Sequence, residues 1–166
     1  MIKGSHQFSS LKIHSIIPFN NKYIICTRDS GLYTVDYEAG AFKNFTSLSH
    51  LSLYASKVDA YFKRNLFYHG IAVDDSLLVL SSILGDVIVV DRGFKVIDVI
   101  DQSTIGVRSN TNFLFYQQSG TLWLALNNGI ASVELMSPFR YWNESVGIDG
   151  VLSDVASKGN YLYVAT

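Results

Sequence analysis

The fold is decided by one stretch of the sequence, Thr121-Leu122-Trp123-Leu124-Ala125, then Leu126-Asn127-Asn128-Gly129, then Ile130-Ala131-Ser132-Val133. Two short apolar runs flank a polar step that ends in glycine. Apolar, aromatic and β-branched residues suit a pleated, half-buried strand. Asn-Gly supplies the positive φ angles that a tight hairpin turn requires. The stretch therefore predicts a β-hairpin.

Three other stretches show the same arrangement of apolar runs around a short polar step. They are residues 23–35, with Arg28-Asp29-Ser30-Gly31 as the step, residues 77–90, with Ile83-Leu84-Gly85-Asp86, and residues 161–166, which stop before a step. When Thr27, Ser81, Ala125 and Thr166 are taken as equivalent, the repeats lie 54, 44 and 41 residues apart. A four-stranded propeller blade occupies roughly 40–50 residues, so this spacing predicts a series of blades.

Further apolar segments complete each repeat. We expect inner strands at residues 11–17, 71–73, 112–116 and 151–156, and outer strands at residues 41–45, 94–100 and 139–142. The sequence therefore predicts an all-β chain, a β-propeller segment of about three and a half four-stranded antiparallel blades in one domain, 1–166. The predicted units are residues 11–46, 69–101, 109–143 and an incomplete unit at 150–166.

The segment from Ser47 to Tyr68 departs from the repeat, since the first spacing is the longest. Its apolar residues at i, i+3, i+7 and i+10 would form a stripe on a short helix, and they are Leu51, Tyr54, Val58 and Tyr61. No clear N-terminal cap is visible for such a helix. A longer pair of strands is the alternative for this segment.

Two of the repeats carry a family resemblance. Residues 112–130 and 154–166 resemble the repeat of two-component regulator propellers, in which a Leu-Trp-Ile-Gly-Thr-like strand is followed by Gly-Leu and an aromatic residue. Leu122-Trp123-Leu124-Ala125-Leu126 has Ala-Leu in place of Gly-Thr, and Tyr163-Val164-Ala165-Thr166 keeps the threonine. Ile25-Cys26-Thr27 with Gly31-Leu32-Tyr33 keeps the threonine, the Gly-Leu and the aromatic. The unit around Gly85-Asp86 is the most divergent.

The resemblance implies a function. Such propellers are sensor regions of bacterial hybrid histidine kinases and related regulators, typical of Bacteroidetes, and they respond to glycans. It implies a periplasmic or cell-surface location and a ligand that is an oligosaccharide, another small molecule or a partner protein. The signal would pass to an effector outside this chain. A propeller lyase and an assembly module of a cell-surface secretion protein are the alternatives.

The number of units raises the question of ring closure. A closed propeller has at least four blades. We expect the chain to be part of a longer propeller, because an open array would leave sheet faces rich in Val, Ile and Leu in contact with water. Two copies that close a ring together, as a homodimer, are the alternative.

Composition excludes several classes of protein. The chain has 13 Lys+Arg and 14 Asp+Glu and a formal net charge of −1, without a basic stripe, so no nucleic-acid partner is expected. Apolar residues make up 48% and aromatic residues 13%, which excludes an intrinsically disordered chain. No apolar run approaches the roughly 20 residues that cross a bilayer. Residues 1–19 show no signal peptide.

Few residues are candidates for chemistry. Cys26 is the only cysteine and lies in an apolar run, where it is expected to pack as a small hydrophobe. Asp74-Asp75 falls at a predicted turn and lacks the pattern of a calcium loop. No metal is expected, because the four histidines show no metal-ligand spacing; they are His6, His14, His50 and His69. No cofactor and no catalytic residue are expected either.

Two aromatic positions are candidates for recognition. Trp123 lies in an alternating strand, which favours burial between neighbouring blades over a role in stacking on a ligand. Arg140, Tyr141 and Trp142, followed by Asn143, combine aromatic and polar groups near a predicted loop. We predict a ligand-binding surface at Arg140, Tyr141 and Trp142. The alternative is an outer strand whose aromatic side chains cover the next blade.

Overall fold

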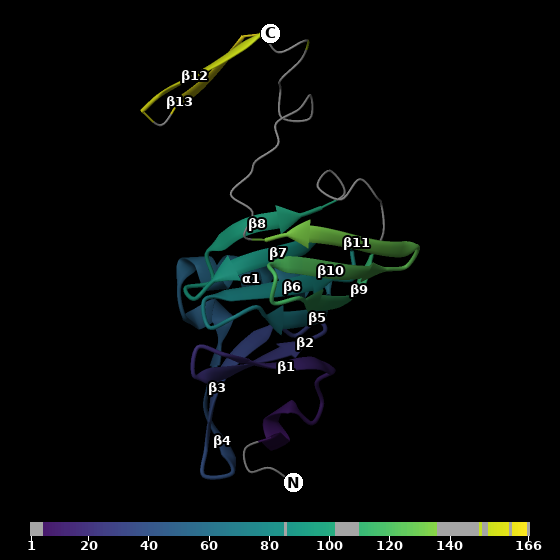
Figure 1. Cartoon of the computed structure of the whole chain (residues 1–166). Helices are drawn as coiled ribbons and strands as arrows, with labels where there is room; N and C mark the ends of the chain where they lie inside the picture. Colours follow the sequence, from purple (N-terminus) through teal and green to yellow (C-terminus); the bar gives the residue numbers. More distant parts are fainter. Residues whose placement is uncertain are drawn as a thin grey trace. The chain divides into compact units, whose positions relative to one another are not determined.

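The computed structural model describes residues 5–84, 86–101, 110–135, 150, 153–159 and 161–165. The chain divides into two compact units, Met1–Leu135 and Met136–Thr166. In its described residues the first unit holds three antiparallel sheets and one α-helix (Figure 1). The second unit holds an antiparallel hairpin of β12 (Asp154–Lys158) and β13 (Tyr161–Ala165).

The first two sheets are four-stranded meanders in which each strand pairs with the next along the chain. The first sheet follows the 3-10 turn η1 (Ser5–Phe8) and consists of β1 (Ile13–Phe19), β2 (Lys22–Thr27), β3 (Leu32–Glu38) and β4 (Ala41–Ser47). The second sheet consists of β5 (Phe67–Ala72), β6 (Leu77–Ser82), β7 (Val87–Asp91) and β8 (Val96–Ile100). The predicted all-β architecture of four-stranded antiparallel units is confirmed.

The third sheet shows three described strands, β9 (Thr111–Tyr116), β10 (Thr121–Leu126) and β11 (Gly129–Glu134), in the order β11-β10-β9. Its central hairpin is the stretch that decided the fold, with Leu126 opposite Gly129. The turn is therefore formed by Asn127 and Asn128, one residue earlier than the predicted Asn-Gly pair, and Gly129, with a φ of 155°, is the first residue of β11. The outer strand predicted at residues 139–142 lies outside the described residues.

Several strand boundaries differ from the prediction: the strand expected at residues 71–73 is β5 (Phe67–Ala72), and the one expected at residues 11–17 is β1 (Ile13–Phe19). A local cause is visible at β8. The strand expected over residues 94–100 begins at Val96. The Asp91 carboxylate Oδ1 accepts hydrogen bonds from the backbone N–H of Gly93 (2.8 Å) and of Lys95 (2.9 Å), which folds residues 92–95 into a turn. Phe94 within this turn has a positive φ of 62°, and this conformation is incompatible with a strand.

The segment between the first two sheets forms the 3-10 turn η2 (Leu48–His50) and the helix α1 (Leu53–Asn65), so the helical alternative is the one observed. The expected apolar stripe holds in part: Val58 is buried and Tyr61 packs against the core, whereas Leu51 and Tyr54 are exposed. The other buried helix positions are Ala55, Asp59 and Phe62. The helix also has a cap that was not foreseen. The Ser52 hydroxyl accepts a hydrogen bond from the backbone N–H of Ala55 at 3.1 Å.

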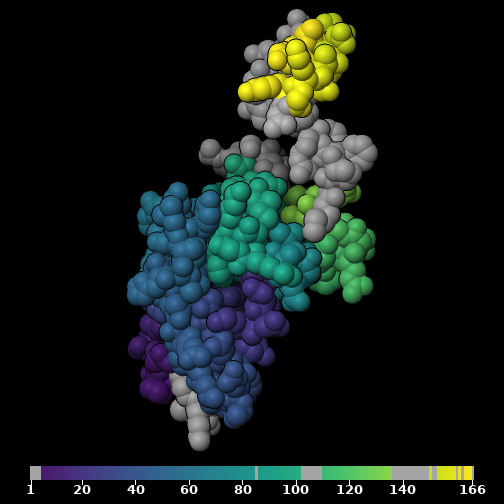
Figure 2. All heavy atoms as spheres, turned by 90° about the vertical axis from the view of Figure 1, so that its left-hand side faces the viewer, coloured from purple at the N-terminus to yellow at the C-terminus, as the bar shows by residue number. Residues whose placement is uncertain are grey.

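The second sheet buries apolar side chains on both of its faces. Alternate residues of β6 and β7 point to opposite sides, as the pleat requires. Leu78, Leu80, Ile88 and Val90 belong to a core shared with the first sheet and α1. Val79, Val87 and Val89 belong to a second core shared with the third sheet. Figure 2 shows α1, in blue, at the surface beside the teal residues of the second sheet.

The first sheet is covered on its other face by the N-terminal turn. Phe8 is buried there and its ring centroid lies 5.5 Å from that of Tyr33 and 5.2 Å from that of Phe45. Ile25 and Val35 complete this third core. The opposite face of β2 carries Cys26, which is fully buried among apolar side chains, as predicted. Burial raises the pKa of its thiol well above the usual value, so Cys26 stays protonated.

We expect Gly70→Ala to destabilise the first unit. A Cβ at Gly70 of β5 would lie 2.7 Å from Leu80 Cδ2 and 2.9 Å from Ile17 Cδ1, so these buried side chains would have to shift within the core. Overpacking of this kind lowers the free energy of unfolding by about 1–3 kcal/mol. Urea unfolding of the full chain measures it. The control is Gly93→Ala on an exposed turn, and an equal loss in the two variants would contradict the prediction.

Candidate functional site

The predicted surface of Arg140, Tyr141 and Trp142 lies outside the described residues, so it stays a prediction. The expectation for Trp123 was wrong. Its side chain is 39% exposed, on the outward face of β10, and its indole Nε1 donates a hydrogen bond to Gln117 Oε1 at 3.1 Å. Phe113 and Phe115 are exposed on the same face, at 54% and 57%. This face of the third sheet is an exposed apolar patch, the kind of surface that packs against another element or a partner.

A groove of about 670 Å³ lies between the first and second sheets. One rim is the β1–β2 hairpin, where Asn20 and Asn21 turn the chain with φ angles of 50° and 58°. The other rim is the turn after β5, with Asp74 and Asp75. Apolar groups line it between the two rims, chiefly Pro18, Phe19 and Ala72. Two loops far apart in sequence therefore form one concave surface.

A smaller pocket of about 170 Å³ shares Phe19, Asn20 and Lys22 with the groove. Its other lining residues come from β2, β3, the end of η2 and the β7–β8 turn, and they are Ile24, Thr34, Leu51, Arg92 and Phe94. Lys22 and Arg92 are its charged residues, and no carboxylate lines it in the described part of the chain. The groove and pocket together combine apolar walls with a few polar groups, as binding sites do.

The charged groups of the groove differ in the hydrogen bonds and ion pairs that they already make. The Asp74 carboxylate accepts hydrogen bonds from the hydroxyl and the N–H of Ser76, both at 2.6 Å, and from the N–H of Leu77 at 2.9 Å. These bonds to Ser76 are the main reason why the pKa of Asp74 is lowered. Asp74 therefore holds the turn together. Among the described residues, the Asp75 carboxylate has no hydrogen-bond or ion-pair partner, and it is exposed.

The two cations, Arg92 and Lys22, also differ in their contacts. Arg92 Nε donates a hydrogen bond to the backbone oxygen of Asp75 at 2.7 Å, which ties the β7–β8 turn to the turn after β5. Lys22 Nζ lies 3.2 Å from Asp36 Oδ1 in an exposed ion pair. A hydrogen bond from Asn44, followed by that from Lys22, lowers the pKa of Asp36. Exposed pairs of this kind are weak, so Lys22 can change partner at little cost.

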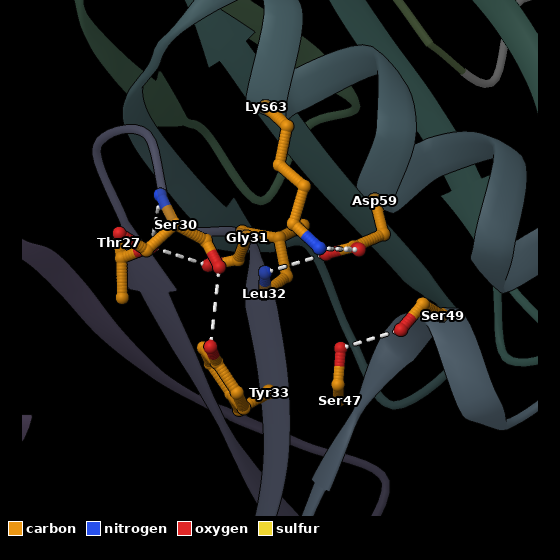
Figure 3. A network of polar contacts seen from close by, with 9 residues as sticks. All are labelled: Thr27, Ser30, Gly31, Leu32, Tyr33, Ser47, Ser49, Asp59 and Lys63. Carbon is orange, nitrogen blue, oxygen red and sulfur yellow. Dashed lines mark hydrogen bonds and ion pairs between the residues drawn. The ribbon is translucent and has the colours of Figure 1, made fainter. Parts of the chain in front are cut away.

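A second polar cluster joins α1 to the β2–β3 turn (Figure 3). The carboxylate of Asp59, which is 1% exposed, accepts a hydrogen bond from the N–H of Leu32 at 2.8 Å and pairs with Lys63 Nζ at 2.7 Å. Gly31 has a φ of 97°, and a Cβ there would collide with both side chains. Because both carboxylate oxygens are occupied, this cluster fastens the helix to the hairpin and offers no group to a ligand.

The same turn is closed from its other side. Thr27 Oγ1 donates to the Gly31 carbonyl at 2.6 Å and accepts from the Ser30 N–H at 3.1 Å. The Tyr33 hydroxyl donates to the Ser30 carbonyl at 3.1 Å (Figure 3). Nearby, the hydroxyls of Ser47 and Ser49 lie 2.8 Å apart. The turn that begins with Arg28-Asp29-Ser30-Gly31 in the first repeat is therefore structural.

His69 lies where β5 meets β9. Its ring stacks on Phe113 with centroids 4.3 Å apart and 36° between the planes. Its Nδ1 accepts a hydrogen bond from the backbone N–H of Leu114 at 3.3 Å. An acceptor nitrogen carries no proton, so the ring is neutral in this arrangement. Burial of the half-buried ring lowers its pKa, which agrees with this contact.

No group of three His, Cys, Asp or Glu side chains suited to hold a metal occurs among the residues described. The helices of the described ranges are too short or too polar to cross a membrane. The groove itself was missed by sequence reasoning, because Asn20-Asn21 and Asp74-Asp75 each have the signature of an ordinary turn. What signals a site is that these two turns face each other, and no local pattern contains that information.

Neither protein-family models nor curated proteins give a match to this chain. Solved structures do. The chain is similar to BBS1N in its complex with ARL6DN, with a TM-score of 0.53 and 9% sequence identity. It is similar to BamB from Moraxella catarrhalis, with a TM-score of 0.52 and 8% identity. It is also similar to YCF48 bound to D1 peptide, with a TM-score of 0.54 and 10% identity. The similarity covers 77–78% of this chain and 34–38% of each of those chains.

These structures are β-propellers, and at 8–10% identity the similarity concerns the fold. The chain thus has the architecture of a partial β-propeller, as predicted. It spans little more than a third of the length of those proteins.

We expect loss of the Asp59 carboxylate to weaken the contact between α1 and the β2–β3 hairpin. Asp59→Ala leaves the buried N–H of Leu32 without an acceptor, which lowers the free energy of unfolding by about 1–3 kcal/mol. Asp59→Asn keeps an oxygen in place and should lose less. Chemical unfolding of both variants is the measurement. Lys43→Ala, which removes the exposed pair with Glu38, is the control, and an equally small effect for Asp59→Ala would refute this role.

The contact of His69 predicts a pH dependence. Since its pKa is lowered in the folded state, the unfolded chain takes up a proton first, near the ordinary pKa of about 6.5. The free energy of unfolding should therefore fall as the pH drops below about 7, by at most about 1.4 kcal/mol per pH unit from this residue. Thermal unfolding between pH 5 and 8 measures the slope. His69→Asn should flatten it more than the exposed His6→Asn does, and equal flattening would contradict the assignment.

Proposed function

We propose that this chain is a binding module that holds a segment of a partner protein in the groove between its first and second sheets. The observation that carries the proposal is the groove itself, whose facing rims offer the Asp75 carboxylate, two asparagines and Lys22 around apolar walls. Binding residues concentrate on loops that a rigid scaffold positions, and both rims are such loops. The volume of about 670 Å³ lies within the usual range of ligand sites.

Two of the similar propellers support a protein partner. BBS1N forms a complex with ARL6DN, and YCF48 binds a D1 peptide. The groove here is open to solvent and not an enclosed cavity, which suits a segment of a protein better than a fully buried small molecule. The chemistry on its rims consists of hydrogen-bonding and charged groups without a paired acid and base, so the proposed role is binding or scaffolding without catalysis.

A second candidate is the function that the family resemblance implies, a ligand-sensing propeller in the extracytoplasmic part of a bacterial two-component regulator. Trp123 favours it, because this aromatic side chain is exposed on the third sheet and aromatic rings bind the faces of sugars. Arg140, Tyr141 and Trp142, the surface predicted from the sequence, are the proposed oligosaccharide-binding residues of this candidate. A periplasmic or cell-surface location belongs to this candidate. A glycan panel tests it, with Trp142→Ala as the informative variant.

The fold also indicates where a further sheet would pack. The exposed apolar face of the third sheet, with Phe113, Phe115 and Trp123, is the kind of surface that another propeller sheet covers. The further sheets of a ring would come from additional residues of the same polypeptide or from a second copy of this chain. Light scattering of the purified chain distinguishes a monomer from a homodimer.

The groove proposal is tested by selecting phage-displayed random peptides on the wild-type chain and measuring their affinities by calorimetry. Asp75→Lys reverses the charge of one rim and should weaken the selected peptides at least 10-fold. Asp98→Lys makes the same exchange on the exposed strand β8, outside the groove, and should leave affinity unchanged. Circular dichroism of both variants verifies the fold. Selected peptides that bind the two variants equally would show that the groove is not the binding site.

A further inference from the structure

The small pocket beside the groove differs from it in charge. In the described chain its two ionisable side chains are both cations, Lys22 and Arg92. The larger groove, by contrast, carries Asp74 and Asp75 opposite Lys22. A ligand that reaches from the groove into the pocket therefore passes from a rim with carboxylates to one with cations alone.

Arg92 is held in position to present its guanidinium group. Its Nε is fixed by the Asp75 carbonyl at 2.7 Å, a neutral acceptor that leaves the positive charge unpaired by any carboxylate in hydrogen-bond contact. The nearest competitor is Asp74, whose pKa Arg92 lowers less than the hydrogen bonds from Ser76 do. The Oδ1 atom of Asp74 already accepts three hydrogen bonds, from Ser76 and Leu77. The outer N–H groups of Arg92 can thus donate to a carboxylate in the two-point geometry that arginine favours.

Part of the pocket wall is apolar. Phe94 occupies the turn between β7 and β8 with a φ of 62°, an uncommon conformation for a residue with a bulky side chain. Its ring centroid lies 6.4 Å from that of Phe19, so the two rings form one side of the pocket. Ile24 and Leu51 contribute further apolar surface. An aliphatic or aromatic side chain would find a dry contact here beside the charge of Arg92.

We infer that the small pocket takes an apolar side chain from the bound protein segment, and that a carboxylate next to that side chain binds Arg92 with help from Lys22. This inference rests on the proposed function and adds the chemistry of the partner, an acidic residue beside Leu, Ile or Phe. Lys22 contributes by leaving its exposed pair with Asp36. The carboxylate can come from an internal Asp or Glu or from the C-terminus of the segment.

The phage-selected peptides provide the probe. They should be enriched in Asp or Glu adjacent to an apolar residue, and Arg92→Ala should weaken them at least 10-fold. Arg92→Lys keeps the charge without the fork and should give an intermediate loss. Lys95→Ala removes a cation from the same turn, outside the pocket, and should leave affinity unchanged. Synthetic peptides in amidated and free-acid forms distinguish an internal carboxylate from a C-terminal one.

The outcomes separate the two proposals. Peptides that depend on Asp75 but bind Arg92→Ala normally, without an acidic preference, would overturn the carboxylate inference and leave the groove proposal standing. Peptides that ignore both positions would overturn both. Phenylacetate, an apolar carboxylate without a peptide chain, is the second probe. If it binds as tightly as the peptides and depends equally on Arg92, a small-molecule carboxylate replaces the protein segment as the ligand.

Discussion

The described structure depends on one constraint, that a sheet with apolar side chains on both faces must be covered on both. In the second sheet, alternate residues of β6 and β7 are buried on opposite sides, which makes it the middle layer between the first and third sheets. Burial of apolar surface stabilises the folded state by roughly 25 cal/mol per Å². Leaving either face of the second sheet in water would therefore destabilise the fold. The groove follows from the same constraint, since the two sheets that meet at Leu78 and Leu80 hold their connecting turns side by side.

Much of this architecture was predictable because it is local. Leu77–Ser82 was predicted to the residue, since a run of six apolar and small residues beside a Gly-Asp turn contains all the information a buried strand needs. The register of α1 was not predictable from the apolar residues alone. Asp59 is a polar residue on the buried side, and Tyr54 is an aromatic residue on the exposed side. The hairpin turn at Gly31, which needs an acceptor for the N–H of Leu32, is what places Asp59 inside.

The candidate site was not predictable from sequence, and the reason is geometric. Its residues lie on turns, and each turn has a sufficient local explanation: Asn20-Asn21 close a two-residue hairpin and Asp74 caps its own turn. Arg92 acquires a role only because its Nε reaches across to the turn after β5. The sequence led instead to Arg140, Tyr141 and Trp142, where aromatic and polar residues are adjacent in the chain, and that choice remains untested.

The N-terminal turn gives the stack of sheets a polarity. Phe8 seals the outer face of the first sheet by packing on Tyr33 and Phe45, whereas the outer face of the third sheet presents Phe113 and Phe115 to solvent. A further sheet could therefore pack on the third sheet without displacing any described residue. At the first sheet, an added sheet would have to displace Phe8, which covers that face. The two outer faces therefore differ, since the chain itself covers that of the first sheet and leaves aromatic side chains of the third sheet exposed.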